Sequence, residues 1–164
     1  MEEKSLVPGR DNIVLIGMPG AGKSTLGIVL AKILCMDFVD ADLLIQQSCD
    51  KSLQRLIDTL GPDAFIEIEN QVLSEMSFEH SVIATGGSAI YSDAAMKHLG
   101  EIGRIVYLKI SFDELKRRLA DFSDRGVVMK GGIGMSLRDL YDERLPLYEQ
   151  YADITVDVND LTIT

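Results

Sequence analysis

Gly17-Met18-Pro19-Gly20-Ala21-Gly22-Lys23-Ser24 decides the fold, because it follows the pattern G-x-x-x-x-G-K-[ST]. The run before it, residues 12–16, is apolar without alternation, as in a strand buried on both faces of a parallel sheet. After it, apolar residues recur at helical spacing. Glycines let backbone N–H groups turn toward a phosphate, and the helix N-terminus adds its dipole. The stretch therefore predicts a phosphate cradle in which Lys23 reaches the β- and γ-phosphates and Ser24 holds Mg²⁺.

The rest of the chain repeats the alternation of strand and helix. Further strands are expected at 37–40, 81–84, 104–110 and 154–158, and a glycine-rich loop at 121–135. Helices are expected through 41–78 with breaks near Asp50 and Gly61-Pro62, at 92–99 closed by Gly100, after a cap at Ser111 or Asp113, and at 136–151. This order predicts an α/β fold, a parallel sheet with helices on both faces and ligands at the carboxyl ends of the strands.

Size, charge and cysteine content exclude several classes. The 164 residues suit one domain, 1–164. The net charge of −10 argues against nucleic-acid and anionic-membrane partners, which call for a basic face. No signal-peptide layout opens the chain and no apolar run nears the roughly 20 residues of a membrane span, so we expect a cytoplasmic protein. Cys35 and Cys49 lack metal-site spacing and are expected to be reduced thiols.

Guanine recognition is not indicated, since the chain has no N-K-x-D, and a small chain with a glycine-rich later loop favours a kinase with a closing lid at about 121–135. Residues from about 12 to 160 resemble the shikimate kinase family. The matching segments are the phosphate loop, Phe38-Val39-Asp40-Ala41-Asp42, Gly61 through Glu69, Ala84-Thr85-Gly86-Gly87, Arg117-Arg118 and Glu143-Arg144-Leu145-Pro146-Leu147-Tyr148. The resemblance implies a three-layer P-loop kinase fold with a five-stranded parallel sheet. It also implies transfer of the γ-phosphate of ATP, with Mg²⁺, to a hydroxyl of a small carboxylated metabolite, shikimate first, by a monomer.

The resemblance also implies roles for individual residues. Asp42 orients the acceptor hydroxyl and is either its base or only its orienting group, and Arg125 of the lid reaches the active site. Arg118 stacks on adenine, Asn159 lies near it, and Arg144 binds the acceptor carboxylate. The implied sets are Lys23, Asp42 and Arg125 for catalysis; Gly17, Gly20, Ala21, Gly22, Lys23, Ser24, Thr25, Arg118 and Asn159 for ATP; Asp42, Gly86, Gly87 and Arg144 for the acceptor; and Ser24 and Asp40 for Mg²⁺.

Some positions allow another interpretation. Asp42 is also what the first turn of any helix favours, and Arg118 is also compatible with a solvated helix face. Ile66 stands where the family has an arginine that holds the shikimate carboxylate, Ser88 replaces the third glycine of G-G-G, and Gly126 replaces a lid proline. These departures leave open a different hydroxylated acceptor or a nucleotide-binding module without catalysis. We expect no part in the chemistry for His80 and His98. Glu67, Glu69 and Glu75 are expected to form a mostly solvated face, although Glu69 also matches a glutamate of the family, which would brace an arginine.

Overall fold

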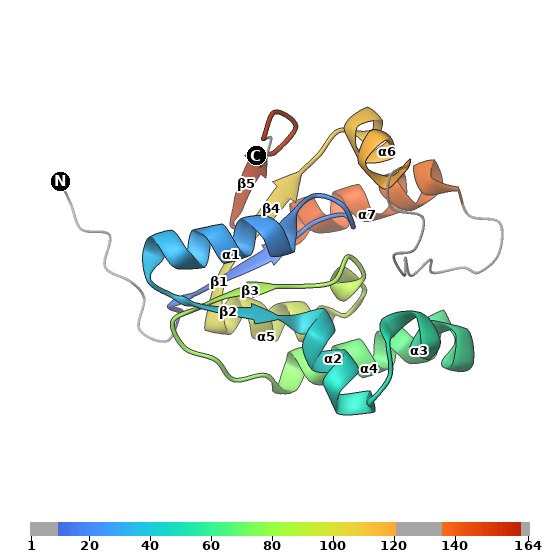
Figure 1. Ribbon diagram of the computed structural model, residues 1–164, viewed down its shortest axis with the longest axis horizontal. Helices are drawn as coiled ribbons and strands as arrows, with labels where there is room; N and C mark the ends of the chain where they lie inside the picture. The colour runs from blue at the N-terminus through green and yellow to red at the C-terminus, as the bar shows by residue number, and fades with distance from the viewer. Residues whose placement is uncertain (1–9, 121–135, 162–164) are drawn as a thin grey trace.

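The computed structural model describes residues 10–120 and 136–161, so Arg125, Gly126 and the expected lid lie outside the described residues. The chain alternates strands and helices around one sheet (Figure 1). The strands are β1 (Asn12–Ile16), β2 (Asp37–Asp40), β3 (Ser81–Ala84), β4 (Gly103–Lys109) and β5 (Ile154–Asp157). The helices are α1 (Lys23–Leu34), α2 (Ala41–Cys49), α3 (Leu53–Leu60), α4 (Pro62–Glu75), the short 3₁₀ helix η1 (Ala89–Tyr91), α5 (Asp93–Ile102), α6 (Phe112–Ala120) and α7 (Leu137–Tyr151).

The five strands form one parallel sheet in the order β2-β3-β1-β4-β5. β1 lies at the centre, pairing with β3 on one side and β4 on the other. The strand order reverses direction at β1, and ligands of open α/β sheets bind at such a switch point, beyond the carboxyl ends of the strands. The loop that follows β1 therefore starts where the fold favours a binding site.

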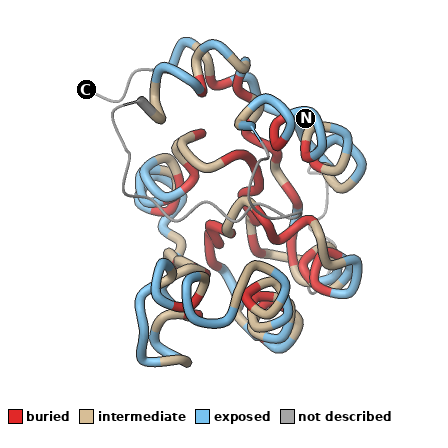
Figure 2. Tube along the Cα trace, turned by 90° about the vertical axis from the view of Figure 1, so that its right-hand side faces the viewer, coloured by how far each residue is buried: buried red, intermediate tan, exposed pale blue. Residues whose placement is uncertain are grey.

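Alternate residues of the central strands face opposite layers, which gives the molecule three layers. Leu15 and Val82 pack with Ala31 of α1 on one face. Val14, Ile83 and their in-register neighbours pack on the other face, in a cluster that includes residues of α4, α5 and α7. Figure 2 shows this buried interior between helices whose outer sides are exposed. The expected three-layer architecture is confirmed.

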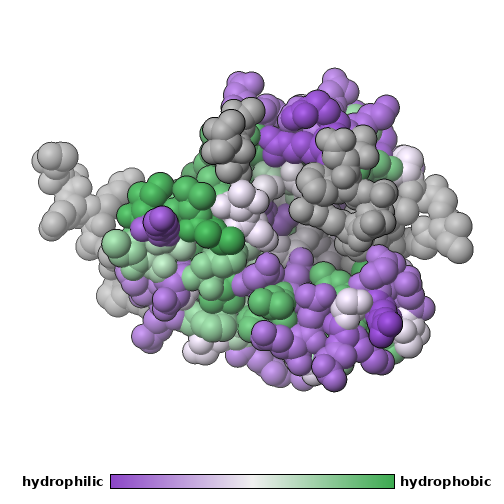
Figure 3. Space-filling model, in the orientation of Figure 1, coloured by the Kyte–Doolittle hydropathy of each residue, from purple (hydrophilic) through white to green (hydrophobic). Residues whose placement is uncertain are grey.

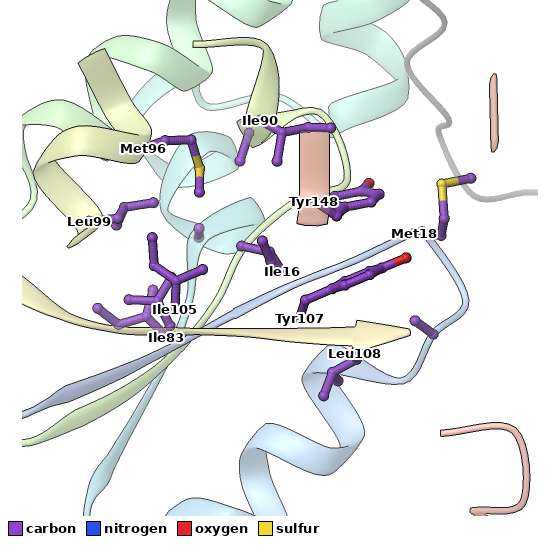
Figure 4. Close-up of a cluster of buried hydrophobic side chains, with 14 of the residues drawn as sticks. Ile16, Met18, Ile83, Ile90, Met96, Leu99, Ile105, Tyr107, Leu108 and Tyr148 are labelled. Atoms are coloured by element: carbon purple, nitrogen blue, oxygen red, sulfur yellow. The ribbon is translucent and has the colours of Figure 1, made fainter. Parts of the chain in front are cut away.

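An aromatic stack joins the sheet to the helical layer that contains α7. The rings of Tyr107 on β4 and Tyr148 on α7 lie nearly parallel, with centroids 5.1 Å apart (Figure 4). Tyr148 also donates a hydrogen bond to the carbonyl of Gly87, 2.7 Å away. The stack thus anchors α7 both to the sheet and to the loop after β3.

One local expectation needs correction. Gly100 does not end α5, which continues to Ile102 and meets β4 at Gly103. A glycine inside a helix costs about 1 kcal/mol relative to alanine, and the buried Leu99 next to it offsets that cost. At the end of β2, Asp40 caps α2, which starts at Ala41, so Asp42 already lies in a helix.

The outer side of α1 is apolar (Figure 3). Ile28, Val29, Ile33 and Leu34 are each at least 44% exposed there. Among the described residues, none of the helices has both the length and the apolar character that a membrane span requires.

Candidate active site

A cavity of about 430 Å³ opens at the carboxyl edge of the sheet, beside the loop between β1 and α1. Its walls come from that loop, from the first turns of α2 and α3, from α4, from the segment after β3, and from α7. The described lining residues are Pro19, Gly20, Gly22, Lys23, Ser24, Thr25, Asp42, Gln46, Ser52, Leu53, Gln54, Ile57, Phe65, Glu69, Thr85, Gly86, Gly87, Ser88 and Arg144.

The loop after β1 has the geometry that its glycines predict. Gly17 has φ +149°, and a Cβ there would lie 2.8 Å from the carbonyl oxygen of Leu108, so no other residue fits. Lys23 starts α1 and folds back over the loop, donating hydrogen bonds to the carbonyls of Gly17 (2.7 Å) and Met18 (2.9 Å). Its ammonium group is nearly buried and is held where the loop and the helix N-terminus converge.

Asp40 and Ser24 meet across the end of the sheet. Oδ1 of Asp40 accepts hydrogen bonds from the backbone N–H groups of Asp42 (3.0 Å) and Leu43 (3.3 Å), which fixes the carboxylate. Its Oδ2 lies 3.5 Å from Oγ of Ser24. Mg²⁺ in nucleotide sites takes one or two protein oxygens with waters and phosphates, so this donor pair fits the ion. No group of three His, Cys, Asp or Glu among the described residues could hold a metal by itself.

Asp42 lies in the first turn of α2 and lines the cavity, whereas Asp40 does not line it. Burial raises the pKa of the Asp42 carboxyl above its usual value, while the ammonium of Lys23 lowers it and ionised Asp40 raises it. Asp42 is thus both an acid in a first helical turn and a partly desolvated carboxylate that faces the cavity.

Arg118 and Asn159 lie at the neighbouring edge, close to the phosphate loop. The guanidinium of Arg118 donates hydrogen bonds to the carbonyls of Gly20 and Ala21, both at 3.3 Å, and of Val158 at 3.0 Å. It also pairs with Glu114, and hydrogen bonds from Arg117 and Arg118 lower the pKa of that carboxyl to about 2. Arg118 is therefore fixed in place rather than a solvated surface arginine.

Asn159 links the strands next to this edge. Its Oδ1 accepts a hydrogen bond from the backbone N–H of Ser111 (2.8 Å), and its Nδ2 donates one to Asp157 (2.8 Å). Neither Arg118 nor Asn159 lines the cavity described above, so the part that both were predicted to play at adenine stays a prediction.

Arg144 lines the cavity and lies against the backbone of Gly87. Its side chain is 1% exposed, its Nε donates to the hydroxyl of Tyr91 (3.2 Å), and its guanidinium lies over the Tyr91 ring. A Cβ on Gly87 would come within 2.7 Å of its Nη1. The glycine is therefore needed for the close approach of the arginine to the backbone.

Glu69 corrects the expectation of a solvated acidic face. Glu67 and Glu75 are exposed, but Glu69 is 2% exposed and lines the cavity. Ser88, also buried, donates a hydrogen bond of 2.5 Å to its Oε1. The other carboxylate oxygen would lie 2.7 Å from a Cβ on Gly86, which would also lie 2.8 Å from Oδ1 of Asp42.

Burial raises the pKa of Glu69 to about 7. The Ser88 hydrogen bond, Arg144 and Lys23 lower that pKa, and Asp42 raises it. Two carboxyl groups thus meet at Gly86, one of them close to half protonated at neutral pH.

Sequence reasoning missed several polar walls of the cavity. Gln46, Ser52, Gln54 and Thr85 line it, and Tyr91 orients Arg144. The one sequence signal that could have placed Glu69 beside the buried Phe65 is their spacing, since residues four apart share a helix face. Ile66, on the next face of α4, packs with a cluster around Ile45, Leu56 and Phe65, and it is not among the cavity-lining residues.

Comparison with known proteins gives a consistent result. The family model described as shikimate kinase matches residues 19–163. A shikimate kinase from Pseudomonas paraeruginosa is 40% identical over 150 residues, 91% of this chain and 87% of that protein. One from Clostridium botulinum is 38% identical over 151 residues, 91% of this chain and 89% of that protein.

Solved structures agree. The shikimate kinase from Acinetobacter baumannii in complex with shikimate superposes with a TM-score of 0.81 at 31% identity, over 94% of this chain and 85% of that one. The chain therefore belongs to the shikimate kinase family, and it is an ATP-dependent kinase of a small molecule.

Proposed function

We propose that this enzyme transfers the γ-phosphate of ATP to a hydroxyl of shikimate, giving shikimate 3-phosphate. The observation that carries the proposal is the single cavity in which Lys23 of the phosphate loop, Asp42 and Arg144 all meet. A phosphate-binding lysine, a carboxylate for a hydroxyl and a buried arginine for a carboxylate are the groups that such a transfer needs. The similar protein that was solved with shikimate supports the same acceptor.

The phosphate loop would hold ATP. Its backbone N–H groups and the N-terminus of α1 would bind the phosphates, and Lys23 would exchange its contacts with loop carbonyls for phosphate oxygens. Thr25 lines the same wall. At the edge beside the loop, the fixed plane of Arg118 would pack on the adenine ring, with Asn159 beside it.

We assign Mg²⁺ to Ser24 and Asp40. The Ser24 hydroxyl and the Asp40 carboxylate would hold the ion, because Oδ1 of Asp40 is fixed by the first turn of α2 while its Oδ2 lies beside Ser24. The bound ion supplies positive charge that balances the phosphate oxygens during transfer.

Asp42 and Arg144 would position the acceptor between them. Arg144 would pair with its carboxylate, and Gly86 and Gly87 would let its ring approach the backbone. Asp42 would accept a hydrogen bond from the reacting hydroxyl, whose oxygen attacks the γ-phosphorus as the bond to the bridging oxygen of ADP breaks. The raised pKa of Asp42 makes it a better acceptor for the released proton than an exposed aspartate. Arg125 lies outside the described residues, and its catalytic role stays a prediction.

The test is ADP release from Mg²⁺-ATP with and without millimolar shikimate, beside a panel of other hydroxy acids and polyols. Shikimate-dependent ADP release, with phosphorylated shikimate detected by mass spectrometry, is expected. Tight ATP binding with no turnover of any compound would refute the proposal and favour a nucleotide-binding module.

A second acceptor is favoured by one observation. Ile66 occupies a position that carries an arginine in the resembled family, and here it packs against apolar neighbours instead of lining the cavity. A related hydroxylated metabolite that does not need a second cationic partner for its anionic group would suit this site. Turnover of a panel member at a kcat/KM tenfold above that for shikimate would establish this alternative.

We further propose that one domain, acting as a cytoplasmic monomer, performs the reaction. The proposal is supported by the meeting of Lys23, Asp42 and Arg144 in one cavity within a single chain. Sedimentation of the purified protein at micromolar concentration tests the monomer.

A further inference from the structure

Among the described residues that line the cavity, Glu69 is the ionisable one without a role in the proposed reaction. It lies on α4, is 2% exposed, and lines the cavity between Asp42 and Arg144. Its Oε1 accepts the hydrogen bond from Ser88, and its Oε2 approaches the backbone of Gly86 together with Oδ1 of Asp42. A buried carboxyl in this position affects the charge that an acceptor meets.

The charges that line the cavity disfavour the binding of an anion when both carboxyl groups are ionised. Among the described lining residues, the side chains of Lys23, Asp42, Glu69 and Arg144 carry the ionisable groups. Lys23 belongs to the phosphate end, where it contacts loop carbonyls. Of these described groups, one guanidinium and two carboxyl groups therefore lie at the acceptor end. An anionic acceptor that pairs with Arg144 is repelled by both carboxylates when both are ionised.

The elements packed around α4 supply the other influences on Glu69. Asp42 of α2 raises its pKa, and Arg144 of α7 and Lys23 of α1 lower it; among the described residues no charged group of α3 or α5 has a comparable effect. Tyr148 of α7 is close enough that ionised Glu69 raises the pKa of its phenol.

Ser88 can hold Glu69 in either protonation state. A hydroxyl donates to a carboxylate and can also accept from a protonated carboxyl, whereas a glycine does neither. Ser88 itself is 4% exposed and sits just before η1. Its side chain therefore keeps Glu69 in place while the proton comes and goes.

We propose that Glu69 and Ser88 determine the specificity of the acceptor site, which takes an anionic acceptor in the form where Glu69 carries a proton and is hydrogen-bonded to Ser88. The inference rests on the proposed function and adds to it. When Glu69 is ionised beforehand, one proton is taken up from solvent for each anion bound, which leaves the net charge at the acceptor end unchanged. Burial supports this, because it brings the pKa of Glu69 to about 7, so the proton costs little to add at neutral pH.

The experiment is a calorimetric titration of the nucleotide-free enzyme with shikimate at pH 6.5 and 8.5. If only the protonated form binds, the fraction competent to bind falls between these values and the Kd rises by about 25-fold. Repeating the pH 8.5 titration in two buffers of different ionisation enthalpy should give an uptake of nearly one proton per shikimate. The methyl ester of shikimate, which has no charge, should bind with the same Kd at both pH values.

Variants separate this role from a structural one. E69Q, a neutral mimic of the protonated side chain, should bind shikimate with a pH-independent Kd and no proton uptake. E67Q removes an exposed carboxylate from the same helix and should keep the 25-fold change. In S88A the loss of the hydrogen bond raises the pKa of Glu69, so the weakening of binding should start at a higher pH. S88T should restore the wild-type pH at which the binding of shikimate weakens.

Each outcome decides a point. A Kd for shikimate that is the same at pH 6.5 and 8.5 would overturn the role of Glu69 even if shikimate is turned over. The role of Glu69 would also be overturned, whatever the turnover, if the Kd of E69Q for shikimate rose with pH as it does in the wild type. An equal rise in the Kd of the wild type for the methyl ester would overturn it too. If the binding of shikimate to S88A weakened at the same pH as in the wild type, Ser88 would be removed from the proposal. Failure of shikimate to bind at all would overturn both this inference and the proposed function.

Discussion

Gly86 offers the sharpest test of the acceptor site, because the two carboxyl groups of that site meet at its backbone. In G86A the added Cβ would lie 2.7 Å from Oε2 of Glu69 and 2.8 Å from Oδ1 of Asp42. Ordinary contacts begin at 3.4 Å, so the two oxygens must move away by about 0.7 Å and 0.6 Å. The ends of the two side chains can make that shift, and the backbone can stay where it is.

The expected loss is in turnover more than in stability. Since a misplacement of 1 Å costs about 10²-fold in rate, a displacement of this size should lower kcat with shikimate by about 20-fold. Overpacking that flexible side chains relieve should cost about 1 kcal/mol of unfolding free energy. The KM for ATP should stay within twofold, because Gly86 does not belong to the phosphate loop.

The assay is steady-state ADP release with each substrate varied in turn, together with chemical denaturation. G100A is the matched control: its Cβ would lie 3.7 Å from Cδ1 of Ile105, an ordinary contact in the interior of α5. It should keep wild-type kcat and gain about 0.5–1 kcal/mol of stability. Wild-type kcat in G86A would refute the placement of the acceptor hydroxyl at Asp42.

Three further predictions follow from the same geometry. K23A and D42A should each lower kcat by at least about 10³-fold with little change in unfolding free energy, measured by ADP release and denaturation; turnover in D42A near the wild-type rate would remove Asp42 from the acceptor site. H98A should keep kcat within twofold, because the ring of His98 bonds the carbonyl of Met76 away from the cavity; a tenfold loss would contradict this. The unfolding free energy of the wild type should fall relative to E69Q by about 3 kcal/mol between pH 4.5 and 8, because the folded state holds a proton on Glu69 up to about pH 7 that the unfolded chain releases near pH 4.5. Denaturation curves for both proteins at three pH values check the sign, and parallel curves would show that Glu69 ionises normally.

The parts of the fold that local pattern predicts are those where one residue type has one use. Gly17 must be glycine because a carbonyl oxygen occupies the space of a Cβ, and Lys23 follows at a fixed spacing, so the phosphate loop is legible in the sequence. The central strands β1 and β3 can be predicted from the sequence because burial on both faces demands an unbroken apolar run.

Other features depend on tertiary contacts that the sequence does not display. Glu69 and Glu67 are both glutamates on one helix, and only the packing of α4 against the segment after β3 buries the first and exposes the second. Gly100 matches the usual stop signal of a helix, yet the burial of Leu99 carries α5 past it. Tyr91 orients Arg144 from a distance of more than 50 residues along the chain, with no motif to mark it.

Ile66 and Ser88 were separate departures in the sequence, and the structure gives them a common effect. Ile66 lies three residues before Glu69 on α4, a spacing at which helical side chains are neighbours, so an arginine there would be within reach of that carboxyl. Such a pair would keep Glu69 ionised and would add a second cation for an anionic acceptor. With isoleucine at 66, packed among apolar side chains, Ser88 supplies the hydrogen bond to Glu69. On the proposal above, a proton on Glu69 reduces the negative charge of the pocket, as an arginine at position 66 would. The affinity for an anionic acceptor then falls as the pH rises. The two substitutions therefore belong to one altered acceptor site that stays able to bind an anion, and this argues against the loss of its function.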